Sequence, residues 1–387
     1  MTHRYRQYVF WLACGATMCL AIAANLPPVF LTTFAEAFGG SGGLSEEQLG
    51  RISALVFAGF VAGIAIASPF ADRLGAKPFV LFGLASLAVG LGLLGMAQTY
   101  GALLAAVFLL GFGAGVLEVV MSPVVAALQP HRRAAALNWL HAAYSLGAVG
   151  TVLIGSSALH FGVPWRTATL AIIAVPACVL VGFATVRNLP LVHDDGVCEP
   201  VRSLLHHKYL WAAFALIALG GGVEIGIAQW LPAYAERNLG YSKAAAGIAL
   251  AAFSVAMLVG RVVIGHWVLR VRAVNLMVAC CAACLVLLMV ASFAPARVMA
   301  LGACIVLGFG VSCFWPTTLS LAGDRYPRGG ASMFGLLAAF GNVGCMTVPW
   351  IVGLVAERSS LAIGIATIAI CPATMVVLLV AIRRRSN

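Results

Sequence analysis

The sequence predicts an all-α membrane protein in which twelve transmembrane helices form two pseudo-symmetric six-helix bundles. Three observations indicate this fold class: a very apolar composition, about a dozen apolar runs of membrane-spanning length, and an internal repeat at an offset of 197 residues. Because such repeats mark duplicated structural units, the two bundles are expected to have the same internal arrangement.

Composition excludes the soluble classes of protein. Hydrophobic residues make up 62% of the 387 residues and charged residues only 9%, and the mean hydropathy is +1.03. Soluble domains do not reach these values. The formal net charge of +11 does not indicate nucleic-acid binding, because no basic stripe is interleaved with aromatic residues.

The apolar runs are separated by short polar breaks. A helix needs roughly 20 residues to cross about 30 Å of hydrocarbon. The sequence predicts twelve such helices, over residues 8–36, 48–71, 78–98, 101–128, 137–160, 166–187, 209–236, 243–268, 275–293, 298–322, 330–356 and 360–382.

Basic residues predict the orientation of these spans. An even number of spans places both termini on one side, and 16 of the 23 Lys and Arg fall on that side, with six opposite and Arg261 inside a span. Cytoplasmic loops carry the excess of basic residues. We therefore expect both termini in the cytoplasm and a location in the inner (plasma) membrane.

Matching segments define the repeat. Residues 44–50 (Leu-Ser-Glu-Glu-Gln-Leu-Gly) match 241–247 (Tyr-Ser-Lys-Ala-Ala-Ala-Gly), and 111–113 match 308–310 as Gly-Phe-Gly. A slip of three residues is needed to pair 147–150 with 341–344. The serine in each copy of the first motif is a candidate N-cap, and Gln48 completes a capping box in the first copy.

The repeat predicts the domain organisation. An N-terminal bundle spans 1–187, a cytoplasmic linker 188–208, and a C-terminal bundle 209–387. The linker is the longest polar stretch and contains three histidines. We interpret it as a solvated connection between the halves; a metal site on those histidines is the alternative.

Three charges lie deep within apolar spans: Glu118, Glu224 and Arg261. A charge at bilayer depth is costly unless it faces water, finds a partner or is neutralised, so each is a functional candidate. Arg261 lies some two turns from the cytoplasmic end of its span. Its guanidinium either extends to the membrane surface or pairs with a buried acid or a gate.

The loop after the second span resembles a known signature. Residues 68–77 (Ser-Pro-Phe-Ala-Asp-Arg-Leu-Gly-Ala-Lys) are similar to Gly-x-x-x-Asp-Arg-x-Gly-x-Lys/Arg of the major facilitator superfamily, with Ser68 in place of the first glycine. The resemblance implies the major facilitator fold. It also implies that Asp72 and Arg73, with Lys77, gate the cytoplasmic side by pairing across helices; a solvated turn is the alternative.

Further segments resemble the fucose:proton symporter branch of that superfamily, which includes sodium-dependent glucose transporters. The similar segments are Gly113-x-Gly115-x-x-Glu118, Leu137-Asn138-x-x-His141-x-x-Tyr144-x-x-Gly147, Gly222-Val223-Glu224-x5-Trp230, Gly260-Arg261-x-x-x-Gly265 and Trp315-Pro316-Thr317. Where fucose symporters carry an acid late in span one, this chain has Asn25. The resemblance therefore implies no proton site there.

Glu118 ends a stripe of small residues on span four. Gly111, Gly115, Glu118 and Ser122 recur at helical spacing, which is typical either of a cavity face or of a tight helix contact. Burial favours the neutral form of a carboxyl group. Glu118 is thus a candidate proton carrier or solute acceptor, with a structural interhelical role as the alternative.

Span seven offers a second acid beside a glycine run. Gly220-Gly221-Gly222 precedes Glu224, and we expect a bend or unwound backbone there. Glu224 is a candidate for contact with solute or cation. Gln229 and Trp230 suit a sugar's hydroxyls and its C–H face, although Trp230 is also typical of an interfacial belt.

Five further side chains are candidates. Asn25 and Asn342 lie at corresponding depth in spans one and eleven, and His141 and Tyr144 share one face of span five. Each either reaches the solute or hydrogen-bonds to another helix. Trp315 falls 197 residues after Glu118, so the repeat places an indole in one half where the other has an acid.

These features predict a secondary active transporter that moves a sugar or similar small polar solute by alternating access around a central cavity, by proton-coupled symport. A proton-coupled exporter of drugs or metabolites, sodium-coupled sugar uptake, and a membrane receptor or enzyme are the alternatives. No Walker A or hydrolytic motif is present. We expect no cofactor and no metal site, sodium being a possible coupling ion in place of the proton. We also expect a monomer whose partners are a small-molecule solute and the lipid bilayer, with no nucleic acid.

Overall fold

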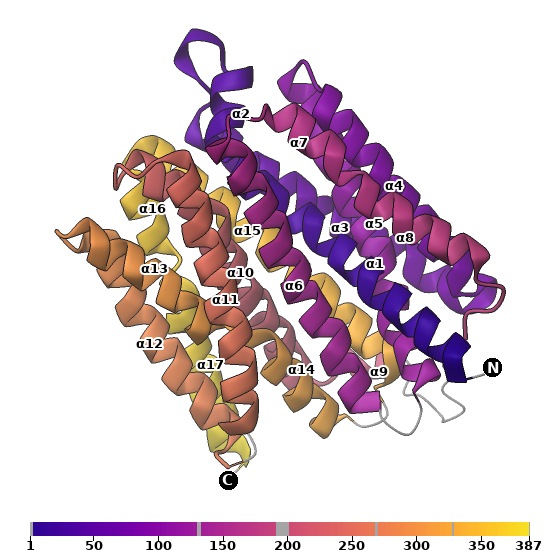
Figure 1. The fold of residues 1–387 in the computed structure, drawn as a ribbon. Helices are drawn as coiled ribbons and strands as arrows, with labels where there is room; N and C mark the ends of the chain where they lie inside the picture. The colour runs from indigo at the N-terminus through magenta and orange to yellow at the C-terminus, as the bar shows by residue number, and fades with distance from the viewer. Residues whose placement is uncertain (1–2, 130–132, 191–200, 268–269, 327–328, 387) are drawn as a thin grey trace. The chain divides into compact units, whose positions relative to one another are not determined.

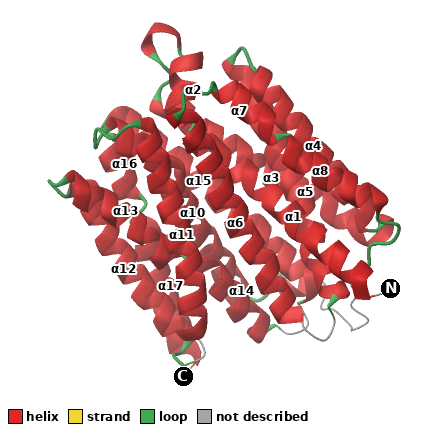
Figure 2. Cartoon of the chain, in the orientation of Figure 1, coloured by secondary structure: helices red, strands yellow, loops and turns green. Residues whose placement is uncertain are grey.

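The computed structural model describes residues 3–129, 133–190, 201–267, 270–326 and 329–386. Throughout these ranges the secondary structure is helical and no strand occurs (Figure 2). The predicted all-α class is therefore confirmed. Residues 191–200 of the polar linker, which include His193, lie outside the described ranges. The role of the linker therefore stays a prediction.

Helices follow one another along the chain with short connections (Figure 1). Their bounds are α1 (His3–Val29), α2 (Leu31–Phe38), a 3-10 turn (Gly40–Gly42), α3 (Glu46–Leu74), α4 (Ala76–Met96), α5 (Tyr100–Leu128), α6 (Arg133–His160), α7 (Trp165–Ile172), α8 (Ala174–Thr185), α9 (Val201–Leu204), α10 (Lys208–Arg237), α11 (Lys243–Trp267), α12 (Ala273–Phe293), α13 (Arg297–Val311), α14 (Phe314–Arg325), α15 (Gly330–Arg358), α16 (Leu361–Thr367) and α17 (Ile370–Ser386).

Twelve segments in the described ranges are long and apolar enough to cross a membrane. They agree with the twelve predicted spans to within several residues at each end. The first predicted span, 8–36, is divided: α1 ends at Val29 and α2 continues from Leu31.

The chain forms two compact units. One contains Met1–Gly40 and Leu55–Asp195, and the other contains Ser41–Ala54 and Gly196–Asn387. The start of α3 thus groups with the second unit, while the rest of that helix belongs to the first.

Proline explains three interruptions within spans. Three spans are divided, between α7 and α8, α13 and α14, and α16 and α17, whose first parts end at Ile172, Val311 and Thr367. The residues at these breaks whose carbonyls matter are Ile172, Ser312 and Ile368. A proline follows each of these residues by four positions, at 176, 316 and 372. Because proline has no N–H to donate to the carbonyl four residues earlier, the helix loses one hydrogen bond at that point. Each proline is then tolerated in the first turn of the next helix.

Both predicted helix caps are present. The Ser45 Oγ accepts from the Gln48 N–H at 3.3 Å, and the Gln48 Oε1 accepts from the Ser45 N–H at 2.9 Å, which is the reciprocal capping box. In the second copy, the Ser242 Oγ accepts from the Ala245 N–H at 3.2 Å.

Glycine contacts repeat between the two units. A Cβ added to Gly63 would meet the Phe112 carbonyl, and one added to Gly260 would meet the Phe309 carbonyl. In both cases the two helices approach backbone to backbone, α3 on α5 and α11 on α13. The residue pairs are related by the same offset of 197, so the repeat found in the sequence is also a repeat of packing.

The same offset extends to the fifth helix of each half. A side chain at Gly147 would collide with the backbone of Met18 on α1, and one at Gly344 with the backbone of Ala218 on α10. Gly344 follows Gly147 by 197 residues. Their partners Met18 and Ala218 are 200 residues apart, so this contact keeps the offset at the glycine and departs from it by three residues at the partner. The expected pairing of 147–150 with 341–344 stays a prediction.

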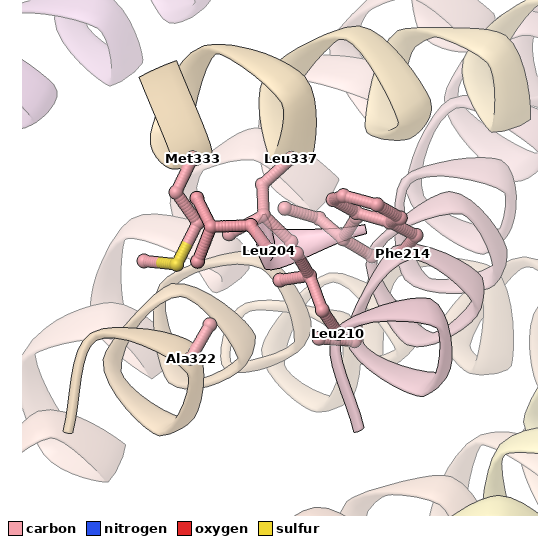
Figure 3. Close-up of a cluster of buried hydrophobic side chains, with 8 residues drawn as sticks. Leu204, Leu210, Phe214, Ala322, Met333 and Leu337 are labelled. Carbon is pink, nitrogen blue, oxygen red and sulfur yellow. The ribbon is translucent and has the colours of Figure 1, made fainter. Parts of the chain in front are cut away.

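The second unit contains a hydrophobic cluster at the start of α10 (Figure 3). Leu204 of the short helix α9 is fully buried with Phe214 of α10 and Leu337 of α15, and Trp315 packs against the cluster's edge. The Phe214 and Phe340 rings stack with centroids 4.4 Å apart. This cluster packs the start of α10 against α15 and contacts the side chain of Trp315.

Candidate functional site

Two of the three membrane-buried charges pair with each other. The Arg261 guanidinium on α11 lies 3.7 Å from the Glu224 carboxylate on α10, and their side chains are 23% and 12% exposed. Arg261 Nη2 also lies 3.9 Å from the sulfur of Met257, one turn earlier. Of the two interpretations of Arg261, pairing with a buried acid is the one that the structure supports.

The backbone before Glu224 is not unwound. Helix α10 is continuous from Lys208 to Arg237. A Cβ at Gly220 would lie 2.8 Å from the Cβ of Phe314, and one at Gly222 would lie 2.5 Å from Val348. The glycine run thus allows α14 and α15 to approach α10 closely.

Trp315 lies against two of these glycine positions. A Cβ at Gly221 would be 3.2 Å from the indole, and one at Gly341 on α15 would collide with the same ring. The ring is half-buried. The Trp315 indole therefore packs against two glycines, and part of the ring remains accessible.

Gln229 and Trp230 are both enclosed. Trp230 is 0% exposed and its Nε1 donates to the Pro349 carbonyl at 2.9 Å. Neither a solute-stacking face nor a position in an interfacial belt is available to a ring so buried, so both interpretations of Trp230 fail in this conformation. Gln229 is 2% exposed and its Nε2 has no hydrogen-bond partner.

The side chains of Gln229 and Glu224 point to different sides of α10. At about 100° per residue, five positions separate their side chains by about 140° around α10. Gln229 shares its face with Gly222 and Gly226, which contact Val348 of α15. A single solute in contact with Glu224 is therefore not expected to reach Gln229.

The two asparagines use their amide groups locally. The Asn25 Nδ2 donates to the Ala21 carbonyl at 2.9 Å, and the Asn342 Nδ2 donates to the Ala338 carbonyl at 2.9 Å. Both bonds return to the preceding turn of the same helix. Asn25 is half-buried and Asn342 is 4% exposed, so Asn25 is the more accessible of the two candidates.

The glycines of the Glu118 stripe are a helix contact. Side chains at Gly111 and Gly115 would collide with the backbone of Val56 and Phe60 on α3. Tight packing is thus the correct interpretation of these two positions. Glu118 lies one turn beyond this contact and is half-buried. Glu118 therefore remains the candidate acidic side chain of the first unit.

His141 and Tyr144 lie on α6 in the first unit. His141 is exposed and Tyr144 half-buried, three residues apart on one side of the helix. Of the motif after the second span, Asp72 is in α3 but its side chain lies outside the described residues, and the Arg73 side chain is exposed. The Lys77 ammonium donates to the Ala184 carbonyl of α8 at 3.3 Å.

Sequence reasoning missed a polar cluster at the start of α3. Glu46 pairs with Arg237 of α10, and Glu357 of α15 accepts from the Glu46 N–H. The capping motif and the acidic pair that follows it were visible in the sequence. The partners, about 190 and 311 positions further on, were not indicated by any pattern.

Comparisons with known proteins agree with this architecture. The family model described as Major Facilitator Superfamily matches residues 12–349 and 235–386. The chain is 21% identical over 331 residues to an uncharacterized MFS-type transporter of Yersinia pestis, with 85% of each chain covered. It is 22% identical over 317 residues to the glucose/mannose transporter GlcP of Bacillus subtilis, with 77% of each covered.

Solved structures share the fold. FucP, a Major Facilitator Superfamily transporter captured in the outward conformation, matches with a TM-score of 0.69 and 22% identity over 99% of this chain and 100% of its own. A D-xylose-proton symporter matches with a TM-score of 0.75 and 14% identity over 97% of each chain.

The predicted superfamily is confirmed by the family match, the twelve spans and the repeated packing together. The chain belongs to the Major Facilitator Superfamily and is a multi-pass membrane transporter, not an enzyme.

Proposed function

We propose that this transporter takes up a sugar or similar small polar solute together with protons, by alternating access. In this proposal it resides in the inner membrane with both termini in the cytoplasm. Among its relatives, one is named a glucose/mannose transporter, one a fucose:proton symporter and one a D-xylose-proton symporter. These names support a sugar as the first class of solute to test.

One observation carries the proposal. Glu118 and Trp315 occupy equivalent positions of the repeat, and the equivalence is supported by packing: Gly111 contacts the Val56 carbonyl as Gly308 contacts the Phe253 carbonyl. Both side chains are half-buried. Each half thus has one candidate group at this position of the repeat, an acid in the first and an indole in the second.

The two groups suit different parts of the task. A partly buried carboxyl group alternates between charged and neutral forms as its surroundings change, which allows it to load and release a proton. An indole offers an apolar face to the C–H groups of a sugar ring. In this proposal Glu118 is the proton carrier and Trp315 a stacking platform.

Glu224 has a different part in the proposal. Because Arg261 lies 3.7 Å away, the charged form of Glu224 is compensated within its own unit. We therefore assign proton coupling to Glu118, and assign Glu224 and Arg261 to the internal structure of the second unit.

The experiment is uptake into proteoliposomes of purified protein, with glucose, mannose, fucose and xylose as labelled solutes. An inward proton gradient, an inward sodium gradient and no gradient are compared. We expect accumulation above equilibrium with the proton gradient alone for at least one sugar. Glu118→Gln should abolish accumulation while preserving exchange of that sugar across the membrane.

Other outcomes would identify other mechanisms. Accumulation driven by sodium alone would replace the proton as coupling ion, and proton-driven efflux of apolar compounds without sugar competition would make the protein an exporter. Unchanged uphill uptake by Glu118→Gln would refute the assignment of Glu118. Glu36→Gln serves as the control, since that acid lies on α2 outside the twelve spans.

A further inference from the structure

Several cysteines lie close together in the second unit, where α12 packs along α13 (Figure 1). Cys280, Cys281 and Cys284 lie on the buried face of α12, and Cys313 lies in the turn between α13 and α14. All four are free thiols in the structure. These helices belong to one compact unit, so the arrangement does not depend on the first half of the chain.

A glycine allows the sulfur atoms of the two helices to approach each other. A Cβ at Gly310 would lie 2.7 Å from the Cys284 Sγ. The Cys313 Sγ donates to the Gly310 carbonyl at 3.7 Å. Cys313 and Cys280 also share a side-chain hydrogen bond. Thiols from both sides of the helix contact therefore surround Gly310.

The chemistry of this contact is that of a thiol pair. Throughout the part of the chain that the structure describes, no group of three or more His, Cys, Asp or Glu side chains is placed to hold a metal ion. Two thiols in contact can instead be oxidised to a disulfide. The bond is about 2.05 Å long and has strict geometry, so at least one backbone must be free to adjust.

Cys313 lies on a backbone with this freedom. Pro316 offers no N–H to the Ser312 carbonyl, and the span is divided immediately beside Cys313. Its partner Cys280 lies within a continuous helix, α12. We therefore expect a shift of the turn, without movement of either long helix, to bring the two sulfurs to bonding distance.

The two thiols differ in their access to a reagent. Cys280 is 8% exposed, whereas Cys313 is 2% exposed. The S–H of Cys313 has two acceptors within reach, the Gly310 carbonyl and the Cys280 sulfur. Turned toward Cys280, this S–H stabilises a thiolate there, and the thiolate is the reactive form of cysteine. Cys280 is thus the thiol expected to react first.

We propose that Cys280 and Cys313 are a peroxide-reactive pair, whose disulfide joins α12 to the turn between α13 and α14. Hydrogen peroxide is a suitable oxidant because it is small and uncharged. The Cys280 thiolate attacks one peroxide oxygen and the O–O bond breaks, which leaves a sulfenic acid on Cys280. The departing hydroxide takes up the proton that the Cys280 thiol released, and forms water.

The second step closes the disulfide. The Cys313 sulfur attacks the sulfenic sulfur of Cys280, and the hydroxyl group leaves with the Cys313 proton as a second water. Two thiols and one peroxide thus give one disulfide and two waters. A dithiol reductant reverses the modification by exchange. Because Trp315 follows Cys313 by two residues, the disulfide restricts the backbone that carries this indole.

The experiment treats the purified protein in lipid nanodiscs with hydrogen peroxide, blocks the remaining thiols and identifies linked peptides by mass spectrometry. We expect a link between Cys280 and Cys313 that is roughly tenfold more abundant than any other pair, because disulfide geometry restricts which thiols can join. Dithiothreitol should remove the link. Backbone hydrogen exchange around Ser312 should be slower in the linked protein than in the reduced protein.

Three variants test the role of each thiol. Cys313→Ala should leave Cys280 as a sulfenic acid, which dimedone traps. Cys280→Ala should give neither the link nor a trapped sulfenic acid at Cys313. Cys304→Ala removes another buried cysteine of α13 and should leave the link unchanged.

Four results would overturn the proposal: no link between Cys280 and Cys313 in the wild-type protein, an equally abundant link to another cysteine, a sulfenic acid trapped at Cys313 in Cys280→Ala, or unchanged hydrogen exchange after linking. The wild-type measurements decide the first two and the last even where a variant does not fold. No measurement here uses a solute, so failure of this proposal is distinguishable from failure of the proposed uptake.

Discussion

The Glu224–Arg261 pair allows its contribution to stability to be predicted in some detail. At 3.7 Å the direct attraction of two unit charges is about 4 kcal/mol in surroundings of intermediate polarity. Desolvation offsets much of this attraction, and the pair as a whole contributes little. Removing one partner is different, because the remaining charge stays in the protein without compensation.

Single and double substitutions should therefore differ sharply. We expect Arg261→Met to lower the free energy of unfolding by about 3 kcal/mol, at the low end for a buried pair because both side chains retain some exposure. Glu224→Gln should cost about 2 kcal/mol, since the long Arg261 side chain can move its charge toward water. The double variant should cost only about 1 kcal/mol, because the pair as a whole contributes little, and this leaves a coupling energy of about 4 kcal/mol.

Thermal unfolding of the purified protein is the assay. For a unit of this size, 3 kcal/mol corresponds to a fall in Tm of about 6 to 12 °C. Met257→Leu, which removes the sulfur beside Arg261 but no charge, is the control and should shift Tm by far less. Single effects that add to within about 0.5 kcal/mol in the double variant would refute the reasoning, because they would show no coupling between the two groups.

Three further predictions test the packing. Gly341→Ala should displace the Trp315 indole and weaken solute binding measured by thermal shift, whereas Gly335→Ala on the same helix, with no atom within 4 Å of the added Cβ, should not. Gly111→Ala and Gly308→Ala should each destabilise the protein by about 1–3 kcal/mol in chemical unfolding, because both force a helix pair apart; a large effect at one position only would contradict the repeated packing. Trp230→Phe should cost about 1 kcal/mol in the same assay through loss of its buried hydrogen bond, and an unchanged midpoint would show that the bond contributes nothing.

Much of the fold could be predicted because the membrane imposes length and composition on each span. The capping box of Ser45 and Gln48 was visible because it is local, and the repeat was visible because it compares the chain with itself. Proline positions alone could not place the breaks. Pro316 leaves the carbonyl of Ser312 without its usual donor and a break follows, but Pro69, Pro123, Pro232 and Pro349 lie inside continuous helices.

The site was harder to predict for a physical reason. In a soluble helix the apolar stripe identifies the buried face, but lipid is as apolar as a protein core, so α10 is apolar on nearly all sides. The sequence therefore gave the depth of Glu224, Gln229 and Trp230 but not their direction. The partner of Arg261 was equally hidden, because 37 residues separate it from Glu224 and no pattern relates the two.

One difference between the halves concerns stiffness. Helix α5 is continuous through Gly115, whereas its counterpart is divided into α13 and α14 at Ser312, the equivalent position of the repeat. A helix that lacks one backbone hydrogen bond bends at that point more easily than a continuous one. Helix α5 contains Pro123 and so also lacks one such bond, to the Val119 carbonyl, but it is not divided there. Because only the helix that carries Trp315 is divided, we expect adaptation to solutes of different size on the indole's side. Pro316→Ala would restore the missing donor, and we expect it to narrow the range of solutes that bind; an unchanged range would contradict this assignment of flexibility.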